Sequence, residues 1–301
     1  METILRPVPP FSFELTAGYQ TYFRGEAGAD VFDGSTYRRV LDIDGKWILA
    51  SVTSNGSIED PELVLRIKGD ELTQGDLQKV MEKIAWMLGF DVDLKPFYAV
   101  AAKDSILSRL VSRFYGMKPT RVSSIFEALV MGIAGQQIAA PVALNLRNRL
   151  AQECGYRFSA DGRTYYSFPD PQTLVDVGIL GLRKLYFSTR KAEYIVGISQ
   201  GVLEKSLDLD SLVGLSDAEV IQRLSQIRGI GVWTAKWVLL RGLGRPNAFP
   251  VEDLALRRMI ADLYFDGKKI TAEEAENLAQ SWQGFRSYAT VYLFAAKRLG
   301  I

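Results

Sequence analysis

The change of hydrophobic periodicity near residue 95 constrains the fold of this 301-residue chain more than any other feature. Before it, apolar and polar residues alternate in short runs, which is typical of half-buried strands. After it, apolar residues recur at three- and four-residue spacing, which indicates packed helices. The sequence therefore predicts an α+β protein with two domains. Residues 1–95 form a small antiparallel sheet with a helix, and residues 96–301 form an all-helical domain.

Within the first domain, we expect strands over residues 11–15, 37–43, 47–53 and 62–68. Asp44-Gly45 separates the second run from the third, and an Asp-Gly pair between alternating runs strongly indicates a hairpin. Residues 75–88 carry apolar side chains on one helical face.

In the second domain, the segment 155–170 lacks a helical period and is expected to be a loop or a short extended excursion. Ser216 with Glu219, and Thr271 with Glu274, have the spacing of capping boxes that begin helices. Other helices are expected over residues 105–115, 125–138, 142–153, 191–203, 254–264 and 288–299, with one more starting at Pro171.

Two near-absences limit the chemistry. The chain has no histidine and a single cysteine, Cys154. This excludes Ser-His-Asp and Cys-His catalysis, histidine-ligated metals, and disulfides, cysteine-rich zinc sites or iron–sulfur clusters within one chain. The formal charge is +1, so a nucleic-acid surface would have to be a local patch. No apolar run is long enough to span a membrane and no signal peptide is visible, which favours a cytoplasmic location.

The segment from Leu224 to Arg258 concentrates the candidate functional residues. Arg228-Gly229-Ile230-Gly231 separates two helical patterns, and the second helix is expected to begin near Val232. Free N–H groups at a helix N-terminus suit a phosphate. Residues 222–258 carry seven basic and two acidic side chains, an asymmetry that also fits a phosphate-binding surface. An ordinary helix–helix turn without a ligand remains the alternative.

Four stretches carry a resemblance to a known family. Residues 224–235 fit Leu-x-x-Ile-x-Gly-Ile-Gly-x-Trp-Thr-Ala, and residues 249–257 fit Phe-Pro-x-Glu-Asp-Leu-x-Leu-Arg. With residues 126–137 and 181–194, they resemble the helix-hairpin-helix DNA glycosylase superfamily, and within it DNA-3-methyladenine glycosylase II. The resemblance implies a sheet domain followed by helices, and double-stranded DNA with damaged bases as the partner.

The resemblance places the catalytic carboxylate at Asp253. Cleavage of the base–sugar bond builds positive charge on the sugar, and a fixed carboxylate facing it stabilises that charge. Glu252 is a competing choice. From the residues alone, a helix N-cap is the favoured role for Asp253.

The resemblance also implies where the reaction stops. Relatives that cut the strand carry a lysine two residues after the second hairpin glycine, where this chain has Trp233. An indole cannot form a Schiff base, and Lys236 lies one turn further along. We therefore expect a monofunctional glycosylase that releases the base and leaves an abasic site.

A base inside a duplex must be flipped into a pocket before it can be excised. Trp233 and Trp237 lie one helical turn apart, and Phe285 and Tyr288 are candidates to complete an aromatic wall. Electron-rich rings suit alkylated purines, which carry a positive charge. Alternatively, Tyr288 is an ordinary residue of the hydrophobic core and contacts no substrate.

The expected DNA contacts lie on the hairpin and at residues 136–137. Gly229, Gly231, Thr234 and Arg228 would hold the backbone, and Gln137 stands where relatives place a wedge that fills the hole left by flipping. Alternatively, both glutamines cap the turn between two helices.

No cofactor is expected to be required. The family binds a monovalent cation through hairpin carbonyls, which correspond to Ser225, Ile227 and Ile230 here, so Na⁺ or K⁺ is expected. The resemblance also implies a monomer. The leading hypothesis is excision of alkylated purines such as 3-methyladenine in base excision repair. The alternatives are a glycosylase for another damaged purine and a non-catalytic DNA-binding protein.

Overall fold

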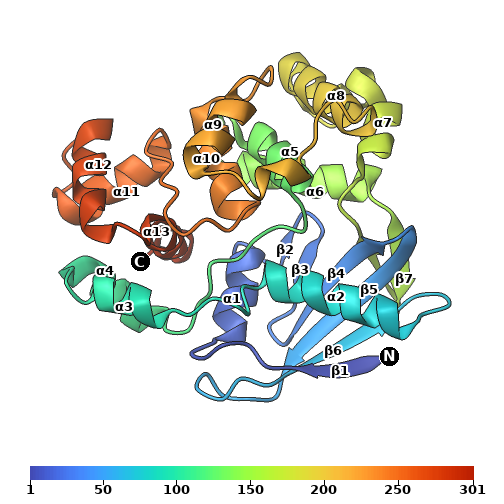
Figure 1. Ribbon diagram of the computed structural model, residues 1–301, viewed down its shortest axis with the longest axis horizontal. Helices are drawn as coiled ribbons and strands as arrows, with labels where there is room; N and C mark the ends of the chain where they lie inside the picture. Colours follow the sequence, from blue (N-terminus) through green and yellow to red (C-terminus); the bar gives the residue numbers. More distant parts are fainter.

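The computed structural model describes all 301 residues and shows an antiparallel sheet followed by a largely helical region (Figure 1). The six strands lie in the order β1-β6-β5-β4-β3-β2, and every neighbouring pair is antiparallel. The central pair, β4 and β5, is joined by the predicted Asp44-Gly45 turn, with Asp42 paired with Trp47. The strands are β1 (Glu2–Leu5), β2 (Glu26–Ala27), β3 (Asp30–Phe32), β4 (Thr36–Ile43), β5 (Lys46–Ser54) and β6 (Leu63–Lys68).

The prediction of a strand over residues 11–15 is wrong. These residues lead into helix α1 (Phe13–Gln20), whose N-cap Ser12 accepts a hydrogen bond from the Leu15 backbone N–H. Phe11 and Phe13 are both buried, which produced the alternating pattern, but Phe13 and Ala17 pack as successive turns of a helix. The Ser12 cap was the sequence signal that outweighs a short alternation.

Both faces of the sheet are covered. On one face, α1 and α2 (Gln74–Met87) pack against the strands to form a cluster of 20 buried residues. On the other face lies a hairpin of β7 (Arg157–Ala160) and β8 (Arg163–Tyr166), which places Tyr165 on Val40 and Leu49. Tyr156 stacks on Trp47 with ring centroids 4.8 Å apart. Of the two predictions for residues 155–170, the extended segment is therefore the correct one. It forms a β-hairpin that connects the helical region to the sheet.

The helices share a second cluster of 55 buried residues. The capping boxes at Ser216 and Thr271 are confirmed, and the helix predicted over 254–264 has those bounds. None of the helices has the length and apolarity required to cross a membrane. The helices are α3 (Lys95–Ala101), α4 (Ser105–Arg113), α5 (Ile125–Gly135), α6 (Ala140–Cys154), α7 (Pro171–Lys184), α8 (Thr189–Leu203), α9 (Asp217–Ser225), α10 (Val232–Arg241), α11 (Leu254–Tyr264), α12 (Ala272–Ala279) and α13 (Arg286–Leu299).

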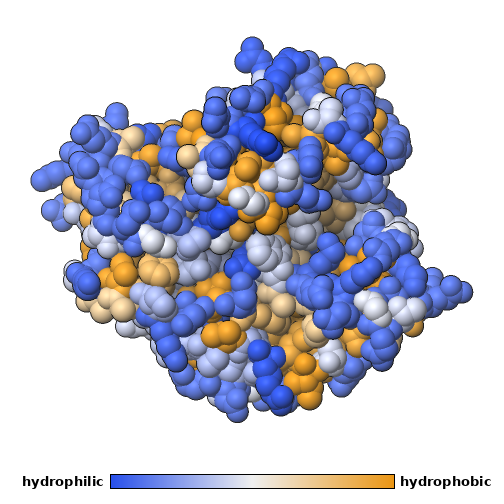
Figure 2. Space-filling view, viewed as in Figure 1, coloured by the Kyte–Doolittle hydropathy of each residue, from blue (hydrophilic) through white to orange (hydrophobic).

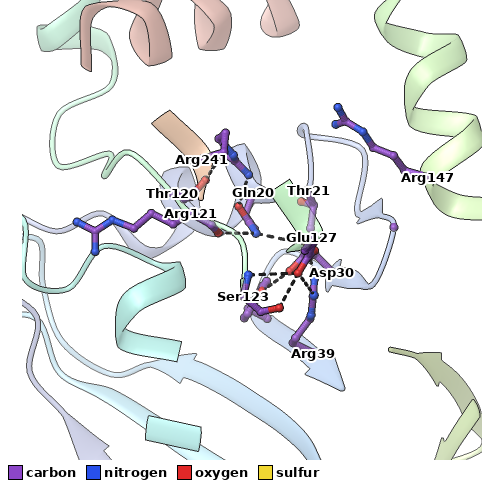
Figure 3. A network of polar contacts seen from close by, with 12 residues as sticks. Gln20, Thr21, Asp30, Arg39, Thr120, Arg121, Ser123, Glu127, Arg147 and Arg241 are labelled. Atoms are coloured by element: carbon purple, nitrogen blue, oxygen red, sulfur yellow. Dashed lines mark hydrogen bonds and ion pairs between the residues drawn. The ribbon is translucent and has the colours of Figure 1, made fainter. Parts of the chain in front are cut away.

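Helix α10 lies centrally in the helical region. In Figure 1 it stands beside α9 and α5, with α11, α12 and α13 on one side and α7 and α8 on the other. At its C-terminal end, the buried Arg241 donates to Thr120 Oγ1 at 2.7 Å and to Gln20 Oε1 at 2.9 Å. Gln20 in turn donates to Asp30, within the buried polar network drawn in Figure 3. The sheet domain thereby fixes one end of α10, and the other end carries the candidate site.

Candidate active site

The glycine hairpin joins α9 to α10. Gly229 has φ of +92°, and a Cβ there would lie 2.3 Å from the ring of Tyr194 on α8, so only glycine fits. Leu224 and Ile230 are buried, and Ile227 packs on the same core. These side chains therefore anchor the turn to the hydrophobic core of the helical region.

Gly231 differs from Gly229 in what surrounds it. It is the N-cap of α10, no side chain caps the helix there, and a Cβ would meet no atom within 4 Å. The N-terminal N–H groups of α10 thus lie next to open space, which is the arrangement that favours an anion. The side chain of Thr234 is buried and accepts a hydrogen bond from Gln136, so only its backbone is available to a ligand.

The two glutamines at the end of α5 do different things. Gln136 is the C-cap of α5, and its side-chain amide donates to Gly229 O at 2.8 Å and to Thr234 Oγ1 at 3.1 Å. It ties α5 to the hairpin. Gln137 is exposed with φ of 53° and has no side-chain hydrogen bond. The side chain of neither glutamine therefore caps the turn between α5 and α6, so that alternative is wrong.

The positive charge of the 222–258 segment is partly neutralised in three dimensions. Arg228, with a side chain 77% exposed, pairs with Glu193 of α8 at 2.8 Å. Lys236 pairs with Glu252 at 2.8 Å, and Arg241 is buried at the far end of α10. The charge asymmetry in the sequence therefore overstates the positive surface beside the hairpin.

Asp253 and Glu252 have separate roles. Glu252 is exposed and engaged with Lys236. Asp253 is half-buried at the N-cap of α11, where its Oδ1 accepts from the N–H groups of Ala255 and Leu256 at 2.8 and 3.0 Å. Its Oδ2 accepts from Trp233 Nε1 at 3.0 Å. One oxygen caps the helix, and the other is oriented by an indole, so capping and a chemical role are compatible in this carboxylate.

Trp233 and Trp237 form the predicted stack on α10. Their ring centroids are 6.3 Å apart with planes 14° from parallel. Trp237 is buried at 9% exposure, whereas Trp233 is half-buried. The indole Nε1 of Trp237 is buried without a hydrogen-bond partner. The outer ring, Trp233, is thus the one that a ligand beside Asp253 can reach.

Phe285 and Tyr288 belong to a different aromatic group. Their ring centroids lie 5.6 Å apart. Both rings also pack on Phe97 of α3, with centroid distances of 6.2 Å from Phe285 and 5.7 Å from Tyr288. Tyr288 is buried beside a cavity of about 10 Å³ that Arg121 also lines. Burial raises the pKa of its hydroxyl, and the charge of Arg121 works against that rise. Neither ring pairs with the two tryptophans, so the structure places Tyr288 in the core, the alternative left open by the sequence.

Arg147 and Tyr22 are neighbours of the tryptophans that the sequence did not indicate. Arg147, on α6, is only 6% exposed and lies 5.9 Å from the ring of Trp237. It donates to the hydroxyl of Tyr22 and, at 3.2 Å, to Met131 O. Tyr22 precedes β2 and therefore comes from the sheet domain. The partners are 125 residues apart, and no spacing rule connects them.

The hairpin carbonyls named as cation ligands are not equivalent. Ile227 O accepts a hydrogen bond from Ile230 N at 3.0 Å, whereas the carbonyl oxygens of Ser225 and Ile230 accept none. The structure has no group of three or more acidic or cysteine side chains placed to hold a metal ion.

Comparison with known proteins assigns the family. The HhH-GPD superfamily of base excision DNA repair proteins matches residues 130–284, just over half of the chain. The chain is 28% identical over 286 residues to a DNA-3-methyladenine glycosylase of Bacillus subtilis, covering 94% of this chain and 93% of the relative. The chain therefore belongs to the HhH-GPD superfamily of base excision DNA repair proteins.

Solved structures agree with this assignment. A 3-methyladenine DNA-glycosylase from Archaeoglobus fulgidus superposes with a TM-score of 0.85 at 28% identity, over 99% of both chains. The 3-methyladenine DNA glycosylase Mag1 of Schizosaccharomyces pombe, in complex with abasic DNA, gives 0.58 at 27% identity, over 67% of this chain and 97% of Mag1. The likeness to the first structure extends through the sheet domain as well as the helices.

Proposed function

We propose that this protein is a monofunctional DNA glycosylase that excises alkylated purines such as 3-methyladenine and leaves an abasic site. The observation that carries the proposal is the carboxylate of Asp253, held by two backbone N–H groups and by Trp233 Nε1 beside the hairpin. The relatives named DNA-3-methyladenine glycosylase support the substrate class.

The carboxylate acts on the sugar. Departure of the base builds positive charge near the sugar ring, and a preorganised negative group stabilises that charge most where water is scarce. Three hydrogen bonds fix Asp253 before substrate arrives, so little reorganisation is required during the reaction. Its half-buried position leaves the carboxylate partly accessible, as a group that faces the sugar requires.

The protein has no hairpin lysine for strand cleavage. At the position where a Schiff-base lysine would stand, Trp233 instead donates to Asp253. Lys236 is held by Glu252 at 2.8 Å. An amine held in an ion pair is a poor nucleophile, so the chemistry ends with base release.

The flipped base would stack on Trp233, with Trp237 behind it. An alkylated purine carries positive charge, which favours contact with the electron-rich face of an indole. Such a base is also a good leaving group, so no acid catalyst is required. This accounts for chemistry without histidine in a chain that has none. Phe285 contributes only through the separate cluster with Phe97.

Double-stranded DNA would bind across the hairpin. The open N-terminus of α10 at Gly231 offers backbone N–H groups to a phosphate. Arg228 and the exposed Gln137 flank this point, and Gln137 is free to enter the duplex when a nucleotide leaves it. The Mag1 complex with abasic DNA supports this partner. We expect the protein to act as a monomer.

We also propose that the hairpin holds a structural Na⁺ or K⁺. The unpaired carbonyls of Ser225 and Ile230 supply oxygen ligands, with Ile227 as a third. Such an ion would steady the turn and add positive charge beside the DNA backbone.

The proposal is tested by incubating a methylated duplex with the wild-type protein and measuring free bases by mass spectrometry. Free 3-methyladenine should be released, and the DNA strand should break only after alkali treatment. Strand breaks without alkali would show lyase activity and contradict the monofunctional assignment. Salt-dependent DNA binding without any released base would instead identify a non-catalytic binding protein.

A further inference from the structure

The segment that carries Asp253 is exposed between two buried anchors. Val251 is buried on one side, and Leu256, in the first turn of α11, is buried on the other. Between them, Glu252 is exposed, and Leu254 is exposed at 74%. No core side chain of residues 252–254 therefore fixes this segment. Its position over α10 depends on the polar side chains that join the two.

Two side chains of α10 reach this segment. Trp233 Nε1 donates to Asp253 Oδ2 at 3.0 Å, and Lys236 Nζ donates to Glu252 Oε1 at 2.8 Å. No other hydrogen bond joins α10 to residues 252–254. Trp233 and Lys236 are three residues apart, so they project from neighbouring positions on one face of the helix. Two successive carboxylates are thus held by two neighbouring side chains of α10.

The ion pair between Lys236 and Glu252 is partly shielded from solvent. Its side chains are 19% and 38% exposed, whereas the Arg228 side chain in the pair with Glu193 is 77% exposed. Shielding weakens the screening that makes most surface ion pairs ineffective. The helix beneath Lys236 is also fixed, because the residues on both sides of it, Ala235 and Trp237, are buried. Lys236 therefore holds Glu252 from a rigid support.

The same ion pair separates the roles of two adjacent carboxylates. Lys236 has no other ion-pair partner, and its charge balances that of Glu252. Asp253 accepts three hydrogen bonds from uncharged donors, so its charge is left for the sugar, where positive charge develops. Without Lys236, Glu252 would be free to compete for the indole N–H of Trp233. The repulsion between the two carboxylates would also be unbalanced.

We propose that Lys236 and Glu252 are positioning residues for base excision. Their ion pair holds residues 252–254 against α10 and thereby fixes Asp253 Oδ2 relative to the sugar of the flipped nucleotide. Neither side chain contacts the reacting atoms, and both act through Asp253. A displacement of about 1 Å at a reacting group can cost about 100-fold in rate, so this restraint has a measurable effect. The inference rests on the proposed function, because it takes Asp253 to be the carboxylate that faces the sugar.

Charge reversal within the pair tests the proposal. Lys236→Glu places two carboxylates against each other, so single-turnover release of 3-methyladenine should slow by about 10- to 100-fold. The rate is measured at saturating protein, and affinity is measured separately with a duplex that carries a tetrahydrofuran abasic analogue. The reciprocal double variant, Lys236→Glu with Glu252→Lys, restores the attraction and should recover to within about fivefold of wild type. A double variant as slow as Lys236→Glu alone would overturn the proposal.

Lys68→Glu is the matched control. It makes the same change of charge in the ion pair with Asp161, which joins β6 to the β7–β8 hairpin. Its single-turnover rate should stay close to that of wild type, because this pair does not hold Asp253. Equal slowing in the control would show that net charge, and not the position of Asp253, sets the rate, and would overturn the proposal.

A milder set of variants covers the case in which Lys236→Glu does not fold. Lys236→Met and Glu252→Gln each break the ion pair, and each should slow base release by about 3- to 10-fold. The double variant should be no slower than the slower single variant, because the pair is already lost. Multiplied losses would overturn the proposal. A loss in Glu252→Gln as large as that in Asp253→Asn would also overturn it, by making Glu252 a catalyst.

The wild-type protein separates failure of this inference from failure of the proposed function. If wild type releases 3-methyladenine and the variants of the pair match its rate, the inference alone fails. If wild type releases no base, the proposed function fails as well.

Discussion

Two buried arginines in this protein have opposite surroundings. Arg39, on β4, is 1% exposed and donates to Asp30 at 2.9 Å and to Glu127 of α5 at 2.7 Å. Arg147, on α6, is nearly as buried but meets only a phenol and a carbonyl. In Figure 3 the first lies within a dense set of dashed contacts, and the second lies outside it.

The difference separates an arginine held by two carboxylates from one whose hydrogen bonds go only to neutral groups. Around Arg39, two carboxylates more than balance one guanidinium, and Glu127 also accepts from Ser123. That network joins the sheet to α5. Around Arg147, the donors exceed the acceptors, and the region borders Trp233 and Trp237. Figure 2 shows apolar residues near α5 and α10 framed by hydrophilic surface, as expected where a flat ligand enters.

The largest expected effect on stability comes from removing Arg39. Arg39→Met leaves Asp30 and Glu127 buried without their counter-charge, which should lower the free energy of unfolding by about 3–5 kcal/mol. Arg147→Met removes a charge that has no partner, so we expect a loss of less than about 1.5 kcal/mol. Thermal melts of both variants measure the difference. Equal destabilisation would mean that Arg147 is as structural as Arg39.

A smaller effect, on rate, is expected from Trp233→Phe. The phenyl ring keeps an aromatic face but removes the N–H that donates to Asp253. A hydrogen bond to a charged group contributes about 1.5–3 kcal/mol, so single-turnover base release should slow by roughly 10- to 150-fold. Trp47→Phe, which alters a stack on the far face of the sheet, is the control. A rate within twofold of wild type would remove Trp233 from the orientation of Asp253.

The smallest expected effect is a shift in the pH at which Tyr22 ionises. Tyr22 has a pKa of about 8 in the folded protein against an ordinary value of 10. Because the folded pKa is depressed, ionisation of Tyr22 stabilises the fold as pH rises above about 8, fully above 10, and contributes nothing well below 8. Phenolate absorbance in wild type minus Tyr22→Phe should show this titration. Arg147→Gln should move its midpoint upward, and an unmoved midpoint would show that Arg147 exerts no field on Tyr22.

Local chemistry made much of the fold predictable from sequence. The Asp44-Gly45 turn, the capping boxes and the helix after Asp253 were all found because each depends on neighbours within a few residues. The prediction for residues 11–15 was wrong because two buried phenylalanines, Phe11 and Phe13, produce an alternating pattern at the start of a capped helix. The hairpin and Asp253 were visible as a pattern, but the Trp233 hydrogen bond to Asp253 was not.

Contacts between the domains were not predictable in this way. Tyr22 meets Arg147, and Gln20 meets Arg241, across 125 and 221 residues. Nothing in the spacing of these residues announces that they will be neighbours. The positive charge around the hairpin likewise cannot be judged from residues 222–258 alone, because Arg228 is paired with Glu193, which lies outside that segment.

The central claim, that Asp253 is the catalyst as well as a cap, is tested most directly by the single-turnover rate of 3-methyladenine release by Asp253→Asn. Asparagine caps a helix as well as aspartate does, so the melting temperature should stay close to that of wild type. It carries no negative charge, so the rate should fall by roughly 10²- to 10⁴-fold while DNA binding is retained. Base release at the wild-type rate by this folded, DNA-binding variant would contradict the account.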